Sequence, residues 1–395
     1  MPAGRRIVIL RVSRAADPAM SNAPIQLAEL PLQRYPATQE PTLLAFDAAD
    51  QYLLTRLAEE QPAATPLLVI NDNFGSLATA LALQGRQVHS WGDSWMAWQA
   101  LQHNLQANGL AAEAVQFFNS QQIPDQHYAQ VLLRIPKSLS LLQDQLQRLR
   151  PQLQDHALLL AGSMLKHLPP TAGDLLAAQI GPYQASLAWK KARLLQCRRD
   201  PALQPAAKPL DSRYPLEGTP LTLHNHPGVF SRERLDIGTR VLLPCITADL
   251  GEARVVDLGC GNGALGLMAA WRNPQARLTF IDESWAAVAS ARQNFQAAFP
   301  DRTAEFIVSD GLSEATAASC DLILCNPPFH QQQVVGDRIA RRLFRQSQRA
   351  LVPGGRLLVV GNRHLGYHLT LQKIFRQVRQ LAANPKFVVL EAGNS

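Results

Sequence analysis

The chain contains few cysteines and no long apolar segment. Its 395 residues include five cysteines, with no Cys-x-x-Cys pair and no histidine pattern beside them that would complete a zinc site. This argues against a disulfide framework, and we expect reduced, buried thiols in a cytoplasmic protein without a bound metal. No segment approaches the ~18 uncharged apolar residues of a membrane-spanning helix, so we expect no membrane partner.

The residues that are present suit a folded protein with an anionic partner. Hydrophobic residues make up 47% of the chain and charged residues 17%, unlike a disordered protein. The length is sufficient for two domains that each bury a core. The formal net charge of +7 favours nucleic acid as a partner without requiring it.

The N-terminus has a weak resemblance to a secretory signal. Arg5 and Arg6 precede an apolar run at 7–10, which is shorter than the roughly 7–15 residues of a signal's apolar region. Met20 then precedes a loop-like Ser-Asn-Ala-Pro segment and is an alternative start of the native protein. We expect residues 1–26 to form an unstructured extension.

The C-terminal half contains a strand, a glycine-rich turn and a helix in succession. The apolar run 255–258 leads into Gly259, Gly261 and Gly263, and residues 264–270 favour the start of a helix. This arrangement lets a backbone approach a nucleotide-like ligand closely. The glycine pattern alone would also fit a dinucleotide-binding dehydrogenase.

Acidic residues at three successive strand ends predict a methyl-donor pocket. Asp257 can accept hydrogen bonds from the ammonium group, or from water, around the methionyl part of S-adenosylmethionine. Asp282 is placed to bind a ribose diol, and Asp310 can accept from the adenine amino group. The predicted donor-binding residues are Asp257, Gly259, Cys260, Gly261, Asn262, Gly263, Asp282, Glu283, Asp310, Gly311 and Asn326, together with Phe230 and Asp236.

Two interpretations of the segment 226–239 stay open. The segment can lie over the donor pocket, with Phe230 or Asp236 touching the ligand. Alternatively it forms a turn and a helix start, because Asp236 and Thr239 are both good capping residues.

The motif Asn326-Pro327-Pro328-Phe329 follows the apolar run 322–325 and predicts the catalytic site. An exocyclic amine on a base is a poor nucleophile, because its lone pair is delocalised into the ring. The Asn326 side-chain oxygen and the Pro327 carbonyl can accept its two N–H groups, and the prolines fix these acceptors in advance. Phe329 can stack on an extruded base. Proximity and in-line alignment should supply much of the rate, without a strong base.

The two halves of the chain resemble each other. Ser94-Trp95 matches Ser284-Trp285 at an offset of 190 (285 − 95 = 190), and the segment 131–137 lies 191 residues before 322–328 (322 − 131 = 191). Several matches in register favour a duplicated α/β domain.

The first copy lacks the residues that would do the chemistry. It keeps one glycine, Gly75, and a gapless alignment places Gly92 opposite Asp282 and Ile135 opposite Asn326. We therefore expect a retained fold with an emptied site. A different pocket served by Asp72 or Asp93 is the alternative.

Three prolines within 201–209 indicate a linker between the copies. We therefore expect an extension at 1–26, a degenerate methyltransferase-like domain at 27–200, a linker at 201–212 and a catalytic domain at 213–395. Apolar strands alternate with helical stretches in both halves. That pattern is typical of an α/β domain with a mostly parallel sheet.

A basic helix face follows the Asn-Pro-Pro-Phe motif. Its arginines recur at spacings of three and four, with no acidic residue among them after Asp337. A solvated face would explain the stripe, but contacts with RNA phosphates are the favoured interpretation. The candidate RNA-binding residues are Arg338, Arg341, Arg342, Arg345 and Arg349, extended by Lys190 and Lys191.

Several motifs together resemble bacterial rRNA guanine-N2 methyltransferases. These are the glycine turn, the Asn-Pro-Pro-Phe-His motif at 326–330, and the segments 228–232 and 235–238. A degenerate first copy is also a mark of that family. The segments 32–38, 188–193 and 362–365 resemble its large-subunit (23S) branch, with the small-subunit (16S) branch as the near alternative.

The resemblance implies two tandem Rossmann-like domains of class I S-adenosylmethionine methyltransferases, each with a seven-stranded sheet. It also implies N2-methylguanosine formation in 23S rRNA, on naked RNA or an assembly intermediate, with the first domain helping to hold the RNA. A monomer is expected, because the duplication already provides a second half. An adenine-N6 or protein glutamine methyltransferase, and a non-catalytic RNA-binding assembly factor, are the open alternatives.

Overall fold

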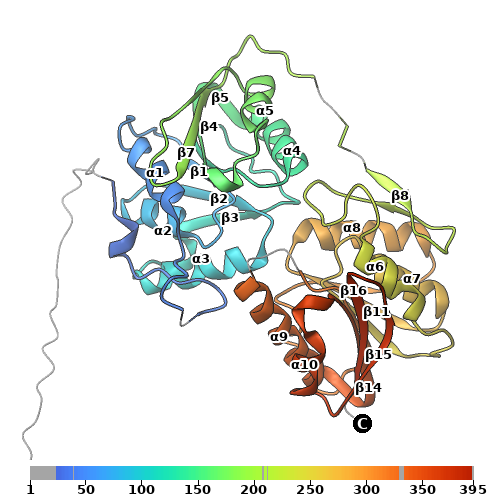
Figure 1. Cartoon of the computed structure of the whole chain (residues 1–395). Helices are drawn as coiled ribbons and strands as arrows, with labels where there is room; N and C mark the ends of the chain where they lie inside the picture. Colours follow the sequence, from blue (N-terminus) through green and yellow to red (C-terminus); the bar gives the residue numbers. More distant parts are fainter. Residues whose placement is uncertain (1–23, 39, 207–208, 211, 329–332, 394–395) are drawn as a thin grey trace, which may run out of the picture.

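The computed structural model describes residues 24–38, 40–206, 209–210, 212–328 and 333–393. The chain forms two lobes, each built on one sheet with helices on both faces (Figure 1). A segment that follows the last strand of the first lobe crosses to the second lobe. Most of the predicted 1–26 extension lies outside the described residues.

The first sheet has the strand order β3-β2-β1-β4-β5-β7-β6, in which the β5–β7 and β7–β6 pairs are antiparallel. Its strands are β1 (Leu67–Ile70), β2 (Val88–Gly92), β3 (Val115–Asn119), β4 (Tyr128–Arg134), β5 (Leu153–Met164), β6 (Tyr183–Ala185) and β7 (Ala192–Arg198). The helices are α1 (Ala48–Leu57), α2 (Ser76–Leu83), α3 (Trp95–Ala107), α4 (Leu139–Leu149) and α5 (Ala172–Gln179). Leu67 and Val69 share a core with α1, α2 and α3, whereas Leu68 and Ile70 pack with α4 and α5.

The second sheet repeats this topology as β12-β11-β10-β13-β14-β16-β15. Its strands are β10 (Arg254–Leu258), β11 (Arg277–Asp282), β12 (Glu305–Val308), β13 (Cys320–Cys325), β14 (Leu351–Asn362), β15 (Gln377–Ala383) and β16 (Phe387–Gly393). The helices are α6 (Ile237–Leu242), α7 (Ala264–Arg272), α8 (Trp285–Ala298), α9 (Gln333–Ala350) and α10 (Tyr367–Gln372). The predicted fold class, with two mostly parallel seven-stranded sheets, is confirmed.

A short hairpin, β8 (Arg213–Pro215) and β9 (Thr222–His224), precedes the second sheet. Leu223 in β9 and Leu216 directly after β8 are fully buried in the core that contains α7 and α8. Among the described residues, no helix is both long and apolar enough to span a bilayer.

The register of the central strands corrects the gapless alignment. Ile70 pairs with Leu133 in the first sheet, and Leu258 pairs with Cys325 at the same place in the second. Arg134, not Ile135, is therefore the counterpart of Asn326. An error of one residue places side chains on the wrong face of a strand, and burial at this strand fixes the register.

Candidate active site and donor pocket

The glycine turn after β10 leaves its backbone open on one side. Gly259, Gly261 and Gly263 all have a positive φ, at 71°, 54° and 86°, a conformation that favours glycine. A Cβ added at Gly259 or Gly261 would meet no atom of the described residues within 4 Å. A Cβ at Gly263 would lie 3.1 Å from the Ala291 Cβ, so this glycine serves the packing of α7 on α8. The first two glycines therefore provide the room that a ligand needs.

Asp282, at the end of β11, ties this turn to the start of α8. One oxygen, Oδ2, accepts the Gly261 N–H at 2.9 Å, and Oδ1 accepts the Ser284 N–H at 3.0 Å. Burial raises the pKa of Asp282 above its usual value. The carboxylate thus holds the open turn in place beside the predicted ribose site.

Asp257 lies behind the turn and outside the set of residues that line the pocket. It is 1% exposed, and its Oδ2 accepts the Gly266 N–H at 2.8 Å. Burial raises the pKa of Asp257 to about 8. Its Oδ1 has no hydrogen-bond partner among the described residues. Through its bond to Gly266, Asp257 stabilises the first turn of α7. Direct contact between Asp257 and the donor stays a prediction.

Asp310 follows β12 and forms an ion pair with Arg342. Its Oδ2 accepts a hydrogen bond from Arg342 of α9, and its backbone carbonyl accepts from Gln346 at 3.1 Å. Gly311, next to it, has a φ of 61° and packs closely under α9. The predicted adenine end of the pocket is therefore built against α9.

The side chain of Asn326 has a fixed orientation. Its Nδ2 donates to Asp236 Oδ2 at 3.1 Å and to Thr239 Oγ1 at 2.9 Å. A carboxylate can only accept, so the amide nitrogen must face Asp236. The Asn326 Oδ1 is buried and has no partner among the described residues, which leaves it ready to accept a hydrogen bond.

In the segment 226–239 the structure contains the predicted helix cap, and it places Phe230 and Asp236 at the cavity wall; contact of either residue with a ligand stays a prediction. Asp236 caps α6 by accepting the Thr239 N–H at 2.9 Å, and it also lines the pocket. Phe230 is 51% exposed at the pocket wall.

One cavity brings much of the predicted donor site together. Its lining residues are Tyr214, Phe230, Ser231, Leu235, Asp236, Thr239, Gly259, Cys260, Gly261, Asn262, Ala264, Leu265 and Asn326. Pro327 is buried and Pro328 is exposed beside Asn326. Phe329, which is predicted to stack on an extruded base, lies outside the described residues. Along the same sheet edge stand Asp282 and Glu283, at the end of β11, and the Asp310–Gly311 pair, after β12.

Sequence reasoning missed the asparagine bonds that hold the segment around β9 to the glycine turn. Asn294 is buried on α8, donates to the carbonyls of His224 (2.8 Å) and Asn262 (3.0 Å), and accepts the His224 N–H at 2.7 Å. Asn262 donates to Tyr214 and Asn225, each at 2.8 Å. The signal was present in the sequence, because Asn294 repeats Asn104 at the offset of 190 (294 − 104 = 190).

The first copy fills the room that the second copy leaves open. Asn71 stands where the second copy has Gly259, and it keeps the left-handed conformation with a φ of 60°. Its side chain donates to the Arg134 carbonyl at 3.0 Å and exchanges hydrogen bonds with Gln145 at 2.8 and 2.9 Å.

An ion pair occupies the counterpart of the Asn326 site. Arg134 donates to both oxygens of Asp47 at 2.8 Å and lies 3.2 Å from Asp50. Asp47 caps α1 as Asp236 caps α6. Although burial raises the pKa of Asp47, the bonded Arg134 guanidinium brings it below its usual value. The first copy therefore binds its own arginine at this place.

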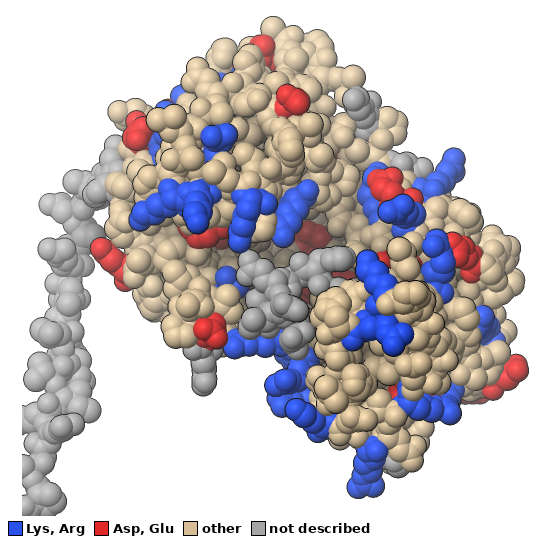
Figure 2. Space-filling view, viewed as in Figure 1, with Lys and Arg blue, Asp and Glu red and all other residues tan. Residues whose placement is uncertain are grey.

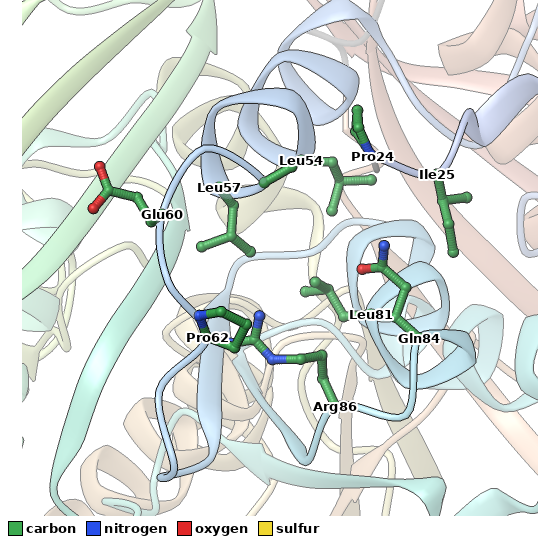
Figure 3. Close-up of a pocket in the computed structure, with 10 residues that line it drawn as sticks. Pro24, Ile25, Leu54, Leu57, Glu60, Pro62, Leu81, Gln84 and Arg86 are labelled. Atoms are coloured by element: carbon green, nitrogen blue, oxygen red, sulfur yellow. The ribbon is translucent and has the colours of Figure 1, made fainter. Parts of the chain in front are cut away.

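A second cavity lies in the first domain, at the edge of the sheet where its parallel strands begin (Figure 3). Leu57 at the end of α1, Leu81 near the end of α2 and Arg86 before β2 line it. Ligands of α/β sheets bind at the carboxyl ends of the parallel strands. This cavity is at their amino ends, away from the edge at which such ligands bind.

The arginines of α9 divide into two groups. Arg342 pairs with Asp310, Arg349 donates to the carbonyls of Leu312 and Ser313 at 3.1 Å, and Arg338 donates to Thr38 at 2.8 Å. Arg341 and Arg345 are exposed. Within the described part of the chain, these two are the α9 arginines placed best for an external phosphate.

Basic side chains also gather on the first domain. Figure 2 shows a row of Lys and Arg side chains across it. Lys190 and Lys191 are exposed on a turn with positive φ angles of 46° and 64°. Lys137 and Lys166 lie close to His167: burial lowers the pKa of this histidine, and both lysines lower it further.

The chain is similar to known methyltransferases. Family descriptions match as "RLMG N-terminal domain" over residues 20–201 and "Methyltransferase small domain" over 220–391. A "Ribosomal RNA large subunit methyltransferase G" from Pseudomonas fluorescens is 53% identical over 366 residues, covering 92% of this chain and 97% of the relative. A protein of that name from Pseudomonas aeruginosa is 53% identical over 367 residues, covering 93% and 98%.

A solved structure shares the fold of both domains. It is a T. Thermophilus 16S rRNA N2 G1207 methyltransferase (RsmC) in complex with AdoMet and guanosine. The TM-score is 0.73 at 23% identity, and the match covers 88% of this chain and 92% of that one.

Proposed function

Because the chain belongs to the ribosomal RNA large subunit methyltransferase G family, we propose that it methylates the exocyclic N2 of one guanine in 23S rRNA. The methyl donor is S-adenosylmethionine, which supplies a methyl group on a positively charged sulfur. The substrate assignment rests on the names of the relatives and on the fold neighbour that acts on N2 of a 16S guanine.

The orientation of Asn326 is the single observation that carries the mechanism. Asp236 and Thr239 hold its amide nitrogen, so the free Oδ1 is presented to the pocket as an acceptor. An acceptor here binds an N–H of the guanine amine and draws the nitrogen lone pair out of conjugation. The Pro327 carbonyl takes the second N–H in our proposal. Both acceptors are fixed before the substrate arrives, which is electrostatic preorganisation.

On the donor side, the uncovered glycine backbone and the carboxylates held by hydrogen bonds fit a bound S-adenosylmethionine. Gly259 and Gly261 leave room along the turn, and Asp282 is placed to accept from the ribose hydroxyls. We propose that Asp310 and Gly311 hold the adenine, while Phe230 and Asp236 close the pocket. Reacting atoms held in line need no strong base, because the nitrogen loses its proton after methylation.

In this proposal residues 213–395 form the catalytic domain, residues 27–200 hold the RNA, and 201–212 join them. Lys190 and Lys191 contact phosphates on the first domain, and Arg341 and Arg345 contact them beside the active site. The target nucleotide must leave its stack to reach Asn326. The substrate is naked 23S rRNA or an assembly intermediate, and the enzyme acts as a monomer in the cytoplasm.

A nucleoside assay tests the proposed reaction. The full chain is incubated with methyl-labelled donor and either 23S or 16S rRNA, and the RNA is digested to nucleosides. We expect label in N2-methylguanosine from 23S rRNA. Label in N6-methyladenosine, label only from 16S rRNA, or no label in either RNA would contradict the proposal.

The exposed arginines of α9 should contribute to RNA affinity through phosphate charge. For the variant with Arg341→Gln and Arg345→Gln, we expect weaker 23S rRNA binding and a log–log salt slope reduced by about 1–2. Arg277→Gln is a matched control, because that arginine is 73% exposed and pairs with Glu252 at 3.0 Å. Filter binding from low to high salt gives both slopes. If the unchanged protein, the double variant and Arg277→Gln all gave equal slopes, the α9 face would make no RNA contact.

A further inference from the structure

The two domains meet through matching contacts from both copies. The Trp95 N–H donates to the Glu283 carbonyl at 2.8 Å, and the Trp285 N–H donates to the Asp93 carbonyl at 3.2 Å. The Ser94 hydroxyl donates to the Glu283 carboxylate, and the Ser284 hydroxyl donates to the Asp93 carboxylate. We call these contacts, made by residues 93–95 and 283–285, the interdomain clasp. It has the self-complementary geometry of a two-fold interface.

The clasp continues directly into the donor site of the second domain. Asp93 Oδ1 accepts the Ala286 N–H at 2.8 Å, in addition to the Ser284 hydroxyl bound at Oδ2. A carboxylate of the first domain therefore caps the N-terminus of α8. The Ser284 N–H in turn donates to Asp282 at 3.0 Å, and Asp282 holds the Gly261 N–H. Three consecutive hydrogen-bonded steps connect Asp93 to the open glycine turn.

The adenine end of the pocket has a similar support. Arg342, which binds Asp310, also points a guanidinium nitrogen at the Met96 sulfur of α3, at 3.8 Å. Figure 1 shows α9 reaching the first lobe next to α3. Asp282 and Asp310, two of the acidic residues predicted to bind the donor, are thus both connected to the first domain.

We propose that Asp93, in the degenerate domain, is a positioning residue for S-adenosylmethionine binding in the catalytic domain. It acts through Ser284 and the start of α8, which fix the carboxylate of Asp282 against the glycine turn. The inference rests on the proposed ribose-binding role of Asp282. It gives the first domain a part in donor affinity, separate from its proposed part in holding RNA.

Donor binding by the full chain tests this inference, with S-adenosylmethionine titrated by isothermal calorimetry. For Asp93→Ala we expect about tenfold weaker donor binding, because an α8 amide and the Ser284 hydroxyl lose a charged acceptor. Asp93→Asn keeps an acceptor oxygen and should bind the donor within about threefold of the unchanged protein. The KM for the donor should rise in Asp93→Ala, while kcat at saturating donor and RNA affinity without donor stay within about twofold.

Two further variants separate the outcomes. Glu40→Gln removes another cross-domain contact, the ion pair with Arg338 at 3.4 Å, and should leave donor affinity unchanged. Asp282→Ala should weaken donor binding directly, because it removes the proposed ribose contact. If Asp282→Ala weakens binding and Asp93→Ala does not, the positioning role is overturned while the proposed site stands. If Asp282→Ala has no effect, the proposed ribose contact fails together with the inference. Equal losses in Asp93→Ala and Glu40→Gln would indicate general loosening and would also overturn the role of Asp93.

Discussion

Replacing Asn326 with alanine is expected to reduce methyl transfer by about 10³-fold while S-adenosylmethionine binding stays within a few-fold. The loss should fall on the chemical step, because in the proposed mechanism the buried Asn326 Oδ1, which has no partner among the described residues, accepts from the guanine amine. Single-turnover transfer from labelled donor to 23S rRNA measures the rate. Calorimetry measures donor affinity in the same preparation.

Thr239→Val provides a graded comparison. It keeps Asn326 but removes one of the two acceptors of its Nδ2, so we expect a smaller loss of roughly tenfold. Near-normal transfer by Asn326→Ala would remove the proposed role of the Asn-Pro-Pro-Phe motif. A proportional loss of donor affinity would make Asn326 a donor-binding residue instead.

Replacing Gly261 with alanine should weaken donor binding by more than ~10-fold without unfolding the protein. The new methyl group would meet no atom within 4 Å in the part of the chain that the structure describes, so it introduces no clash there. It would occupy the room in which the donor passes the glycine turn. The φ of 54° imposes strain of roughly 1 kcal/mol on an alanine.

Gly251→Ala is the matched control for this strain. Gly251 lies in the same domain with a φ of 58°, and a Cβ there also meets no atom of the described ranges within 4 Å. We expect both variants to lose about 1 kcal/mol of stability in urea unfolding, and only Gly261→Ala to lose donor affinity. If both variants bind the donor normally, the turn is not the donor cradle.

The sequence predicted the features that are local to a strand and the turn after it. Gly259, Gly261 and Asp282 follow apolar strands, and parallel strands bring their carboxyl ends to one edge of the sheet. The fold class and the family could therefore be predicted from these motifs and from the repeated pattern. The basic stripe of α9 was also visible, because helical spacing defines a face.

Features that depend on distant partners could not be predicted. Helical spacing shows which arginines share a face, but not that Arg342 finds Asp310 on a neighbouring loop. The bond between Asp93 and Ser284 joins positions separated by 191 residues (284 − 93 = 191). The counterpart of Asn326 was misplaced by one residue, because matching letters carry no information about which face of a strand Arg134 occupies.

The two-fold geometry of the interdomain clasp has a consequence for how substitutions act. In a homodimer with such an interface, each substitution occurs twice and alters both active sites at once. In this single chain it occurs once, so one half can change without harming the other. Asn71 and Arg134 show the result: they fill the ligand room of the first half, while Gly259 and Asn326 keep that of the second half open. Under the proposed function, duplication within one chain thus turns a symmetric pair into one catalytic half and one supporting half.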